Sequence, residues 1–141
     1  MLDSERISIA QHAPAITPVN QPYWEGLDHG VLNLQLCATC GSWQFPPAKY
    51  CRTCLGDDVH WTPSAGTGRI WSWVRFHKAY LPGYRDTPYC VAIVRTDEGP
   101  LLTTRLTEDD ARQVDVDSPV RITFTRSADG VVLLGAAPLD A

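Results

Sequence analysis

The sequence predicts a mainly β protein with two small parts, and three features of the chain carry this prediction. Two close cysteine pairs lie in its first half, at positions 37–40 and 51–54. Five strand-like segments follow from residue 69 onward, and one short helical segment separates the third from the fourth. Such patterns are typical of strands around a thiolate-bound metal and of a Greek-key barrel. We therefore expect a short N-terminal helix and a rubredoxin-like zinc ribbon, followed by a five-stranded OB-fold barrel.

The cysteine pairs are the most specific of these features. Cys37 and Cys40 form the first pair, and Cys51 and Cys54 form the second after ten intervening residues. Four thiolates at this spacing meet at one tetrahedral point, which is the geometry that zinc prefers. Two disulfides, redox use of one pair and iron in a rubredoxin-like site remain alternatives. Because four thiolates fill the coordination sphere, we expect one structural zinc per chain with no open position for catalysis.

Length and composition limit the class of protein. With 141 residues, 44% of them hydrophobic, the chain suits one domain or two small lobes with a real core. The net charge is −4 and only two of the twelve basic residues are lysines, which argues against a general nucleic-acid binder. No segment approaches the roughly 20 apolar residues of a membrane span, and residues 1–7 lack the apolar stretch of a signal peptide. We expect a cytoplasmic protein, since a reducing compartment suits free thiolates.

The chain divides into three regions. Residues 1–19 are expected to form an extended arm, residues 20–65 the helix and zinc ribbon, and residues 66–141 the OB-fold domain. A segment of small residues and glycine at 63–68 marks the boundary between the two lobes. The helix is predicted over residues 21–28, with Asn20 as its cap and Gly30 beyond its end.

Alternating and apolar runs predict the strands. Residues 31–36 alternate and form a half-buried strand that enters the first cysteine pair, and residues 59–62 return from the second. Between the pairs, residues 42–47 are expected to form a stiff apolar loop. The strands of the barrel are expected at residues 70–78, 88–96, 101–106, 120–126 and 131–134. A capping-box signature at 107–110 predicts the short helix, and Asp129-Gly130 predicts a hairpin before the last strand.

Aromatic side chains on two of these elements suggest a contact surface. By strict alternation one face of the first barrel strand carries Arg69, Trp71, Trp73, Arg75 and His77, and the core face carries Ile70, Ser72, Val74 and Phe76. On the predicted helix, Tyr23, Trp24 and Leu27 form an apolar stripe. These aromatic residues either pack on the protein's own core or dock a partner or ligand. We assign to the partner or ligand face Tyr23, Trp24, Trp71, Trp73, Arg75 and His77.

The titratable residues do not form a catalytic set. Cys90 lies within a predicted central strand, where a small buried hydrophobe is a better interpretation than a nucleophile. His77 precedes a loop that contains proline and glycine, and a solvated or structural histidine explains it better than a catalytic one. We therefore expect no catalytic residue in this chain and no turnover by the chain alone.

The order of the motifs resembles that of one known family. The helix around residues 22–27 is followed by a leucine-alternating strand and by the motifs Cys37-x-x-Cys40-Gly41, Phe45-Pro46-Pro47, Cys51-x-x-Cys54, Trp61, Gly68-x-Ile70-Trp71-Ser72, His77, Pro82-Gly83 and Pro88-Tyr89. Over residues 20–137 this order is similar to the acyl-CoA-associated zinc-ribbon/OB-fold family, long catalogued as a domain of unknown function. Cys90 departs from the aliphatic residue expected there, and residues 1–19 lie outside the likeness.

This resemblance implies an accessory role. Family members commonly pair with thiolase-like subunits, including the aldol-lyases that shorten steroid side chains as CoA thioesters, and the partner carries the reactive residues. It implies that this chain is a non-catalytic, zinc-binding subunit of a hetero-oligomer with a catalytic subunit of the sterol-carrier-protein thiolase type. The subunit would support its partner and the acyl-CoA site, with Cys37, Cys40, Cys51 and Cys54 as the metal ligands.

A single-stranded nucleic-acid-binding module is the alternative function. Proteins with a zinc ribbon beside an OB barrel commonly bind single-stranded nucleic acid. Here Trp71 and Trp73, which lie between Arg69 and Arg75, would stack on the bases. The acidic balance of the chain and its scarcity of lysine argue against this role. Salt-sensitive binding to an oligonucleotide would distinguish the two functions.

Overall fold

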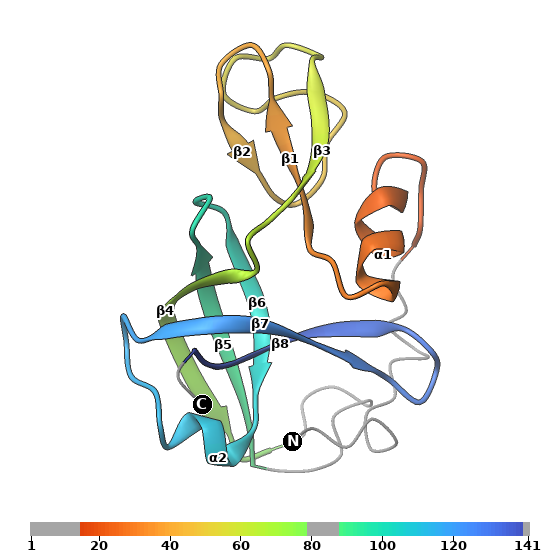
Figure 1. The fold of residues 1–141 in the computed structure, drawn as a ribbon. Coiled ribbons are helices and arrows are strands. Elements are labelled where there is room, and N and C mark those ends of the chain that lie inside the picture. Colours follow the sequence, from red (N-terminus) through yellow and green to blue (C-terminus); the bar gives the residue numbers. More distant parts are fainter. Residues whose placement is uncertain (1–14, 79–87, 140–141) are drawn as a thin grey trace.

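The computed structural model describes residues 15–78 and 88–139, and these residues form two lobes, a small ribbon and a barrel (Figure 1). The expected mainly β architecture, with a short N-terminal helix, a zinc ribbon and a five-stranded barrel, is confirmed. Most of the predicted arm at 1–19 lies outside the described residues, as does most of the loop that follows His77. No helix in the described parts of the chain is long and apolar enough to cross a membrane.

Helix α1 (Gln21–Asp28) has the predicted bounds, but Asn20 does not cap it with its side chain. The Asn20 Oδ1 instead accepts a hydrogen bond from the Thr17 N–H at 2.7 Å, which stabilises the preceding turn. The helix ends where Gly30 adopts a φ of 71°, a conformation that glycine takes without strain. There the N–H groups of His29 and Gly30 donate to the carbonyls of Gly26 and Leu27. The chain can therefore turn directly from α1 into the ribbon.

The ribbon lobe is an antiparallel sheet with the strand order β2-β1-β3. Strands β1 (Asn33–Cys37) and β3 (Val59–Pro63) were predicted, whereas β2 (Trp43–Gln44) lies in the segment expected to be a loop. Because β2 is only two residues long, it leaves no periodic signal in the sequence. Each cysteine pair closes a tight turn, in which the Gly41 N–H donates to the Cys37 carbonyl and the Leu55 N–H to the Cys51 carbonyl, both at 2.9 Å.

The second lobe is a closed barrel of five strands with the order β4-β5-β6-β8-β7. Its elements are β4 (Thr67–Phe76), β5 (Tyr89–Thr96), β6 (Leu101–Leu106), α2 (Glu108–Ala111), β7 (Pro119–Arg126) and β8 (Val132–Pro138). Neighbouring strands are antiparallel except β6 and β8, which run parallel where the barrel closes. The predicted cap of α2 is confirmed, since the Thr107 Oγ1 accepts from the Asp110 N–H at 3.0 Å. Five strands with a short helix between the third and fourth make the expected OB-type barrel.

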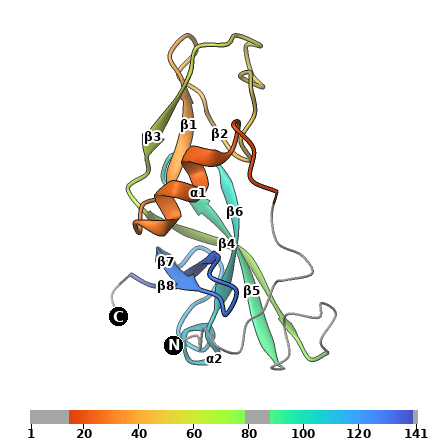
Figure 2. The same ribbon diagram turned by 90° about the vertical axis from the view of Figure 1, so that its right-hand side faces the viewer.

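One hydrophobic core extends from the barrel to α1 and β1. It joins side chains of α1 and the start of the ribbon (Tyr23, Leu27, Leu32 and Leu34) to the barrel residues Ile70, Cys90, Ala92, Val94, Leu102, Leu106, Val120, Ile122, Val132 and Ala136. Helix α1 packs against both β1 and β8, beside the junction of the lobes (Figures 1 and 2). The ribbon is therefore attached to the barrel through shared apolar packing and not only through the chain.

Carboxylates in the turn between β5 and β6 hold the segment that joins the lobes. The Ser64 hydroxyl donates to Glu98 Oε1 at 2.6 Å, and the Ala65 N–H donates to Glu98 Oε2 at 2.9 Å. The Thr67 hydroxyl donates to Asp97, whose own N–H donates to the Thr67 carbonyl at 3.0 Å. These four bonds fix the direction in which the chain enters β4.

Candidate metal centre and partner surfaces

The four predicted metal ligands are brought together at the tip of the ribbon. Their sulfur atoms all lie within 4.8 Å of one another, and the Cys37–Cys54 and Cys40–Cys51 sulfurs are 3.6 Å apart. A tetrahedron with metal–sulfur bonds of about 2.3 Å has edges of about 3.8 Å, so the donor set fits zinc. The S–S bond of a disulfide is about 2.05 Å, and all four thiols are free, which excludes the disulfide alternative for these cysteines. An S4 set of this kind also accepts iron.

The surroundings of the sulfurs favour thiolates at two of the four positions. Hydrogen bonds to the side chain and backbone of Ser42 lower the pKa of Cys40 to about 6. The N–H groups of Cys54 and Thr53 lower the pKa of Cys51. The N–H of Gly56 favours the Cys54 thiolate, but the neighbouring sulfur of Cys37 and burial outweigh it and raise the pKa to about 11. A cation bound by all four sulfurs would displace the protons that remain on the thiols.

Two buried amides, Gln35 and Gln44, position the loop that leads to the second cysteine pair. The Gln44 Nε2 donates to the Gln35 Oε1 at 2.8 Å and to the Tyr50 carbonyl at 3.1 Å. Gln35 also bonds both the carbonyl and the N–H of Ala48 at 2.9 Å. The Gln44 Oε1 accepts from the Arg52 N–H, beside the predicted ligand Cys51. The sequence carries no signal for this network, because alternation places Gln35 on the solvent side of its strand, where glutamine is a common residue.

The predicted common face of β4 is wrong, because the strand has a β-bulge between Ile70 and Ser72. Ile70 pairs with Val94 and Ser72 with Ile93, so the extra residue Trp71 reverses the alternation that follows. Trp73 turns inward opposite Ala92 and packs against the core, and Arg75 lies opposite the buried Cys90. Val74, which was expected in the core, is instead 50% exposed. A bulge of one residue has no reliable signal in a single sequence.

The aromatic residues of α1 are mostly enclosed. Tyr23 is only 6% exposed and contacts Trp24 and Phe45 with ring centroids 5.0 and 5.2 Å apart. Burial raises the pKa of Tyr23 to about 12. Trp24 is half-buried and packs on the same core. These placements favour the interpretation that α1 covers the core. Of the two α1 residues assigned to the partner face, Trp24 is the more exposed.

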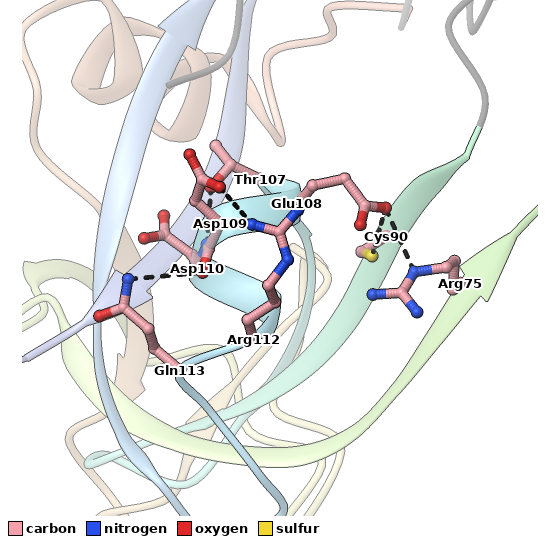
Figure 3. A network of polar contacts seen from close by, with 8 residues as sticks. All are labelled: Arg75, Cys90, Thr107, Glu108, Asp109, Asp110, Arg112 and Gln113. Atoms are coloured by element: carbon pink, nitrogen blue, oxygen red, sulfur yellow. Dashed lines mark hydrogen bonds and ion pairs between the residues drawn. The ribbon is translucent and has the colours of Figure 1, made fainter.

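A polar network at the far end of the barrel joins Arg75, Cys90 and Glu108 (Figure 3). The Arg75 Nε donates to the Glu108 Oε1 at 3.2 Å, and the Cys90 Sγ lies 3.5 Å from the same oxygen. Burial raises the pKa of Cys90, so the thiol stays protonated near neutral pH and is a poor nucleophile. His77 is exposed just beyond the end of β4 and has no described hydrogen-bond partner. Three predicted face residues, Trp71, Arg75 and His77, thus lie in different surroundings.

Comparison with known families identifies both lobes. Residues 24–60 match the rubredoxin-like zinc ribbon domain of ChsH2, and residues 61–125 match the C-terminal OB-fold domain of ChsH2. The two matches are contiguous and cover well over half of the chain. They meet at β3, which agrees with the position of the junction between the ribbon and the barrel.

Two curated relatives are described as subunits of hydratases. The chain is 32% identical over 107 residues to a probable enoyl-CoA hydratase alpha subunit of Thermomonospora curvata, a match that covers 76% of this chain and 33% of the relative. It is 29% identical over 102 residues to the 3-oxo-4,17-pregnadiene-20-carboxyl-CoA hydratase alpha subunit of Mycobacterium tuberculosis, covering 72% of this chain and 32% of the relative. The chain thus spans about a third of the length of these two relatives.

A solved structure matches along most of both chains. It is described as the Ltp2-ChsH2(DUF35) aldolase, and the match has a TM-score of 0.78 and 28% sequence identity, covering 89% of this chain and 98% of that chain. The zinc ribbon, the closed barrel, the two family matches and this structure agree with one another. The chain therefore belongs to the ChsH2 family of zinc-ribbon/OB-fold proteins, also called DUF35.

Proposed function

We propose that this chain is a non-catalytic, zinc-binding accessory subunit of a hetero-oligomeric acyl-CoA enzyme in the cytoplasm. Its partner would be a thiolase-like catalytic subunit, and the reaction a retro-aldol cleavage in steroid side-chain degradation. The observation that carries the proposal is the match to the Ltp2-ChsH2(DUF35) aldolase over 98% of that chain. The names of the two hydratase relatives also support an acyl-CoA pathway and a subunit role.

The metal centre supports a structural role for zinc. Four sulfurs would complete a tetrahedral site and leave no position for a water or a substrate. The cysteines lie at the ribbon tip, and the loops that carry them are held by backbone hydrogen bonds and by the Gln35–Gln44 network. We therefore assign one zinc ion per chain to the folding of the ribbon and not to the reaction.

The described side chains also support a non-catalytic role. Cys90 is fully buried with a raised pKa, and its neighbour Glu108 is paired with Arg75. Within residues 15–78 and 88–139, the one cluster of His, Cys, Asp and Glu with metal-binding geometry is the closed cysteine set. The catalytic groups would therefore come from the partner, in which case the OB barrel supports the partner and its acyl-CoA site.

The proposal is tested by purifying the tagged chain from its source organism under mild conditions. We expect a complex with a thiolase-like subunit, identified by peptide mass spectrometry and given a stoichiometry by the mass of the intact complex. The complex should cleave a steroid acyl-CoA that carries a β-hydroxy group, and the isolated chain should not. A chain that purifies alone, or that cleaves, hydrates or thiolyses acyl-CoA without a partner, would contradict the proposal.

Single-strand nucleic-acid binding is a second candidate, and it rests on the half-exposed Trp71 beside Arg69 and Arg95. It is weakened because Trp73, the second predicted stacking platform, faces the core. A labelled single-stranded oligonucleotide should bind with strong salt dependence if this function is correct. No binding at low salt would remove it.

A further inference from the structure

The outward side of strands β4, β5 and β6 carries exposed apolar side chains beside two arginines, Arg69 and Arg95, that form no ion pair with any other residue described by the structure. We define the arginine–tryptophan face by its six residues Arg69, Trp71, Val74, Ile93, Arg95 and Leu101. Arg69 lies opposite Arg95, Arg95 lies opposite Leu101, and Val74 lies opposite Val91 on the same side of the sheet. The Arg95 guanidinium lies 4.3 Å from the centre of the Trp71 ring, which places Trp71 on this side too.

The exposed apolar side chains of this face lie together and are not scattered singly over the surface. Trp71 is 49% exposed, Val74 is 50% exposed and Leu101 is 43% exposed. Ile93 lies half-buried between them on β5. Among the described residues, helix α1 packs mainly on β1 and β8, and Figure 1 places it at the upper right, above β8, with β4 on the left. Clustered apolar residues of this kind mark interaction sites.

The charge of the face is opposite to that of the whole chain. Arg69 donates to the backbone carbonyl of Asp117 at 2.8 Å, and Arg95 stacks on Trp71. Neither guanidinium forms an ion pair within the described residues, although the chain has a net charge of −4. The outward positions of these three strands carry no carboxylate, and the nearby Asp97 and Glu98 already accept hydrogen bonds from the linker.

These properties select among the possible occupants. A second copy docking through the same face would bring its arginines against those of the first, which is unfavourable. A nucleic acid would use Trp71 and the arginines but would gain little from the aliphatic Val74, Ile93 and Leu101. A protein surface with an apolar centre and an acidic rim complements both the aliphatic side chains and the charge.

We propose that the arginine–tryptophan face is the surface that binds the catalytic subunit, and that the subunit presents an apolar patch bordered by Asp or Glu. This inference rests on the proposed function and adds the surface and its chemistry. Trp71 is the central anchor, since a large aromatic side chain that is exposed in the free subunit gains most when it is buried in a complex. Arg95 holds the Trp71 ring and supplies charge to the rim.

The test measures the affinity of the purified catalytic subunit, recovered with the wild-type chain, for a set of variants. Trp71→Ala should weaken binding by roughly thirtyfold or more. Arg95→Glu should weaken it by at least about tenfold and reduce its salt dependence. Arg52→Glu is the matched control, because it makes the same change of charge at an exposed position on the ribbon and should stay within about twofold of wild type. Unchanged melting temperatures for all three variants show that the fold is intact.

Each other outcome overturns the proposal. Normal binding by Trp71→Ala and Arg95→Glu would move the interface elsewhere and leave the accessory role standing, and a loss confined to Arg52→Glu would place it on the ribbon. A dimer of the wild-type chain that Arg95→Glu abolishes would assign the face to a second copy. Oligonucleotide binding that Trp71→Ala abolishes would assign it to nucleic acid. If the wild-type chain recovers no acyl-CoA enzyme, the proposed function and this inference both fail.

Discussion

Trp71 and Trp73 are two positions apart on one strand but meet opposite environments. The bulge at Trp71 puts Trp73 on the inner side of β4, where it packs against the core, and leaves Trp71 half-exposed beside Arg95. Because both residues are tryptophan, replacing each in turn compares a core-facing position with a surface position.

We predict that Trp73→Ala destabilises the protein by about 3 kcal/mol, because it removes a large, partly buried side chain that packs against the core and leaves a cavity there. Trp71→Ala should change the free energy of unfolding by less than about 0.5 kcal/mol, because its ring already contacts solvent. Urea unfolding followed by circular dichroism measures both values. Equal losses of stability would show that the two side chains share one environment.

Tyr23 should make stability depend on alkaline pH. Its pKa is raised from 10.0 to about 12 by burial, so the unfolded chain ionises first. The contribution of Tyr23 is complete below pH 10 and is lost as the pH rises towards 12, a change of about 2–3 kcal/mol. Tyr23→Phe should remove this part of the pH dependence. Denaturant unfolding of both proteins at several alkaline pH values tests this prediction. If the free energy of unfolding fell equally steeply with pH in both proteins, the prediction would be contradicted.

At the scale of elements, the barrel depends on close contact between β4 and β5. A Cβ atom at Gly68 would lie 2.2 Å from the Arg95 carbonyl oxygen, a backbone atom that has no room to retreat. We predict that Gly68→Ala destabilises the protein by about 2–3 kcal/mol through the forced separation of the strands. The control is Ser72→Ala, because Ser72 lies on β4 like Gly68 but is exposed, so its loss should be nearly neutral. Gly99→Ala is not a suitable control, because Gly99 has a φ of 120°, which alanine rarely adopts. Thermal melting compares the two variants.

Most elements were predictable because each leaves a local pattern in the sequence. The cysteine spacing predicted that four sulfurs would meet, alternation located β1 and β7, and the capping signature at Thr107 located α2. The features that were not predicted depend on contacts between residues that are distant in the sequence. The bulge in β4 is set by its pairing with β5, the two-residue strand β2 by its pairing with β1, and the burial of Gln35 by its bonds to Gln44 and Ala48.

At the scale of the whole molecule, the two lobes share one hydrophobic core. Leu32 and Leu34 of the ribbon side lie in the same core as Ile70 and Val94 of the barrel, and Glu98 holds the segment that connects them. Loss of order in the ribbon therefore removes packing from the barrel as well.

We predict that metal removal unfolds the ribbon and also lowers the melting temperature of the barrel. Metal analysis should give about one zinc per chain, and Cys51→Ser should reproduce the effect of a chelator, since metal binding supplies roughly 10 kcal/mol or more to such ribbons. Hydrogen exchange should show lost protection in β1 and β3 with β5 and β6 still protected. A metal-free chain that melts like the metal-loaded one would contradict this prediction.

The Gln35–Gln44 network has a consequence for how the metal is captured. It bonds the backbone at Ala48, Tyr50 and Arg52, so the loop before Cys51 is held by side chains that are not among the predicted metal ligands. A loop ordered in advance loses less conformational entropy when the ion binds, and the difference appears directly as tighter binding. We therefore expect zinc affinity to depend on two uncharged glutamines as well as on four sulfurs, and to change in sequences that replace either amide.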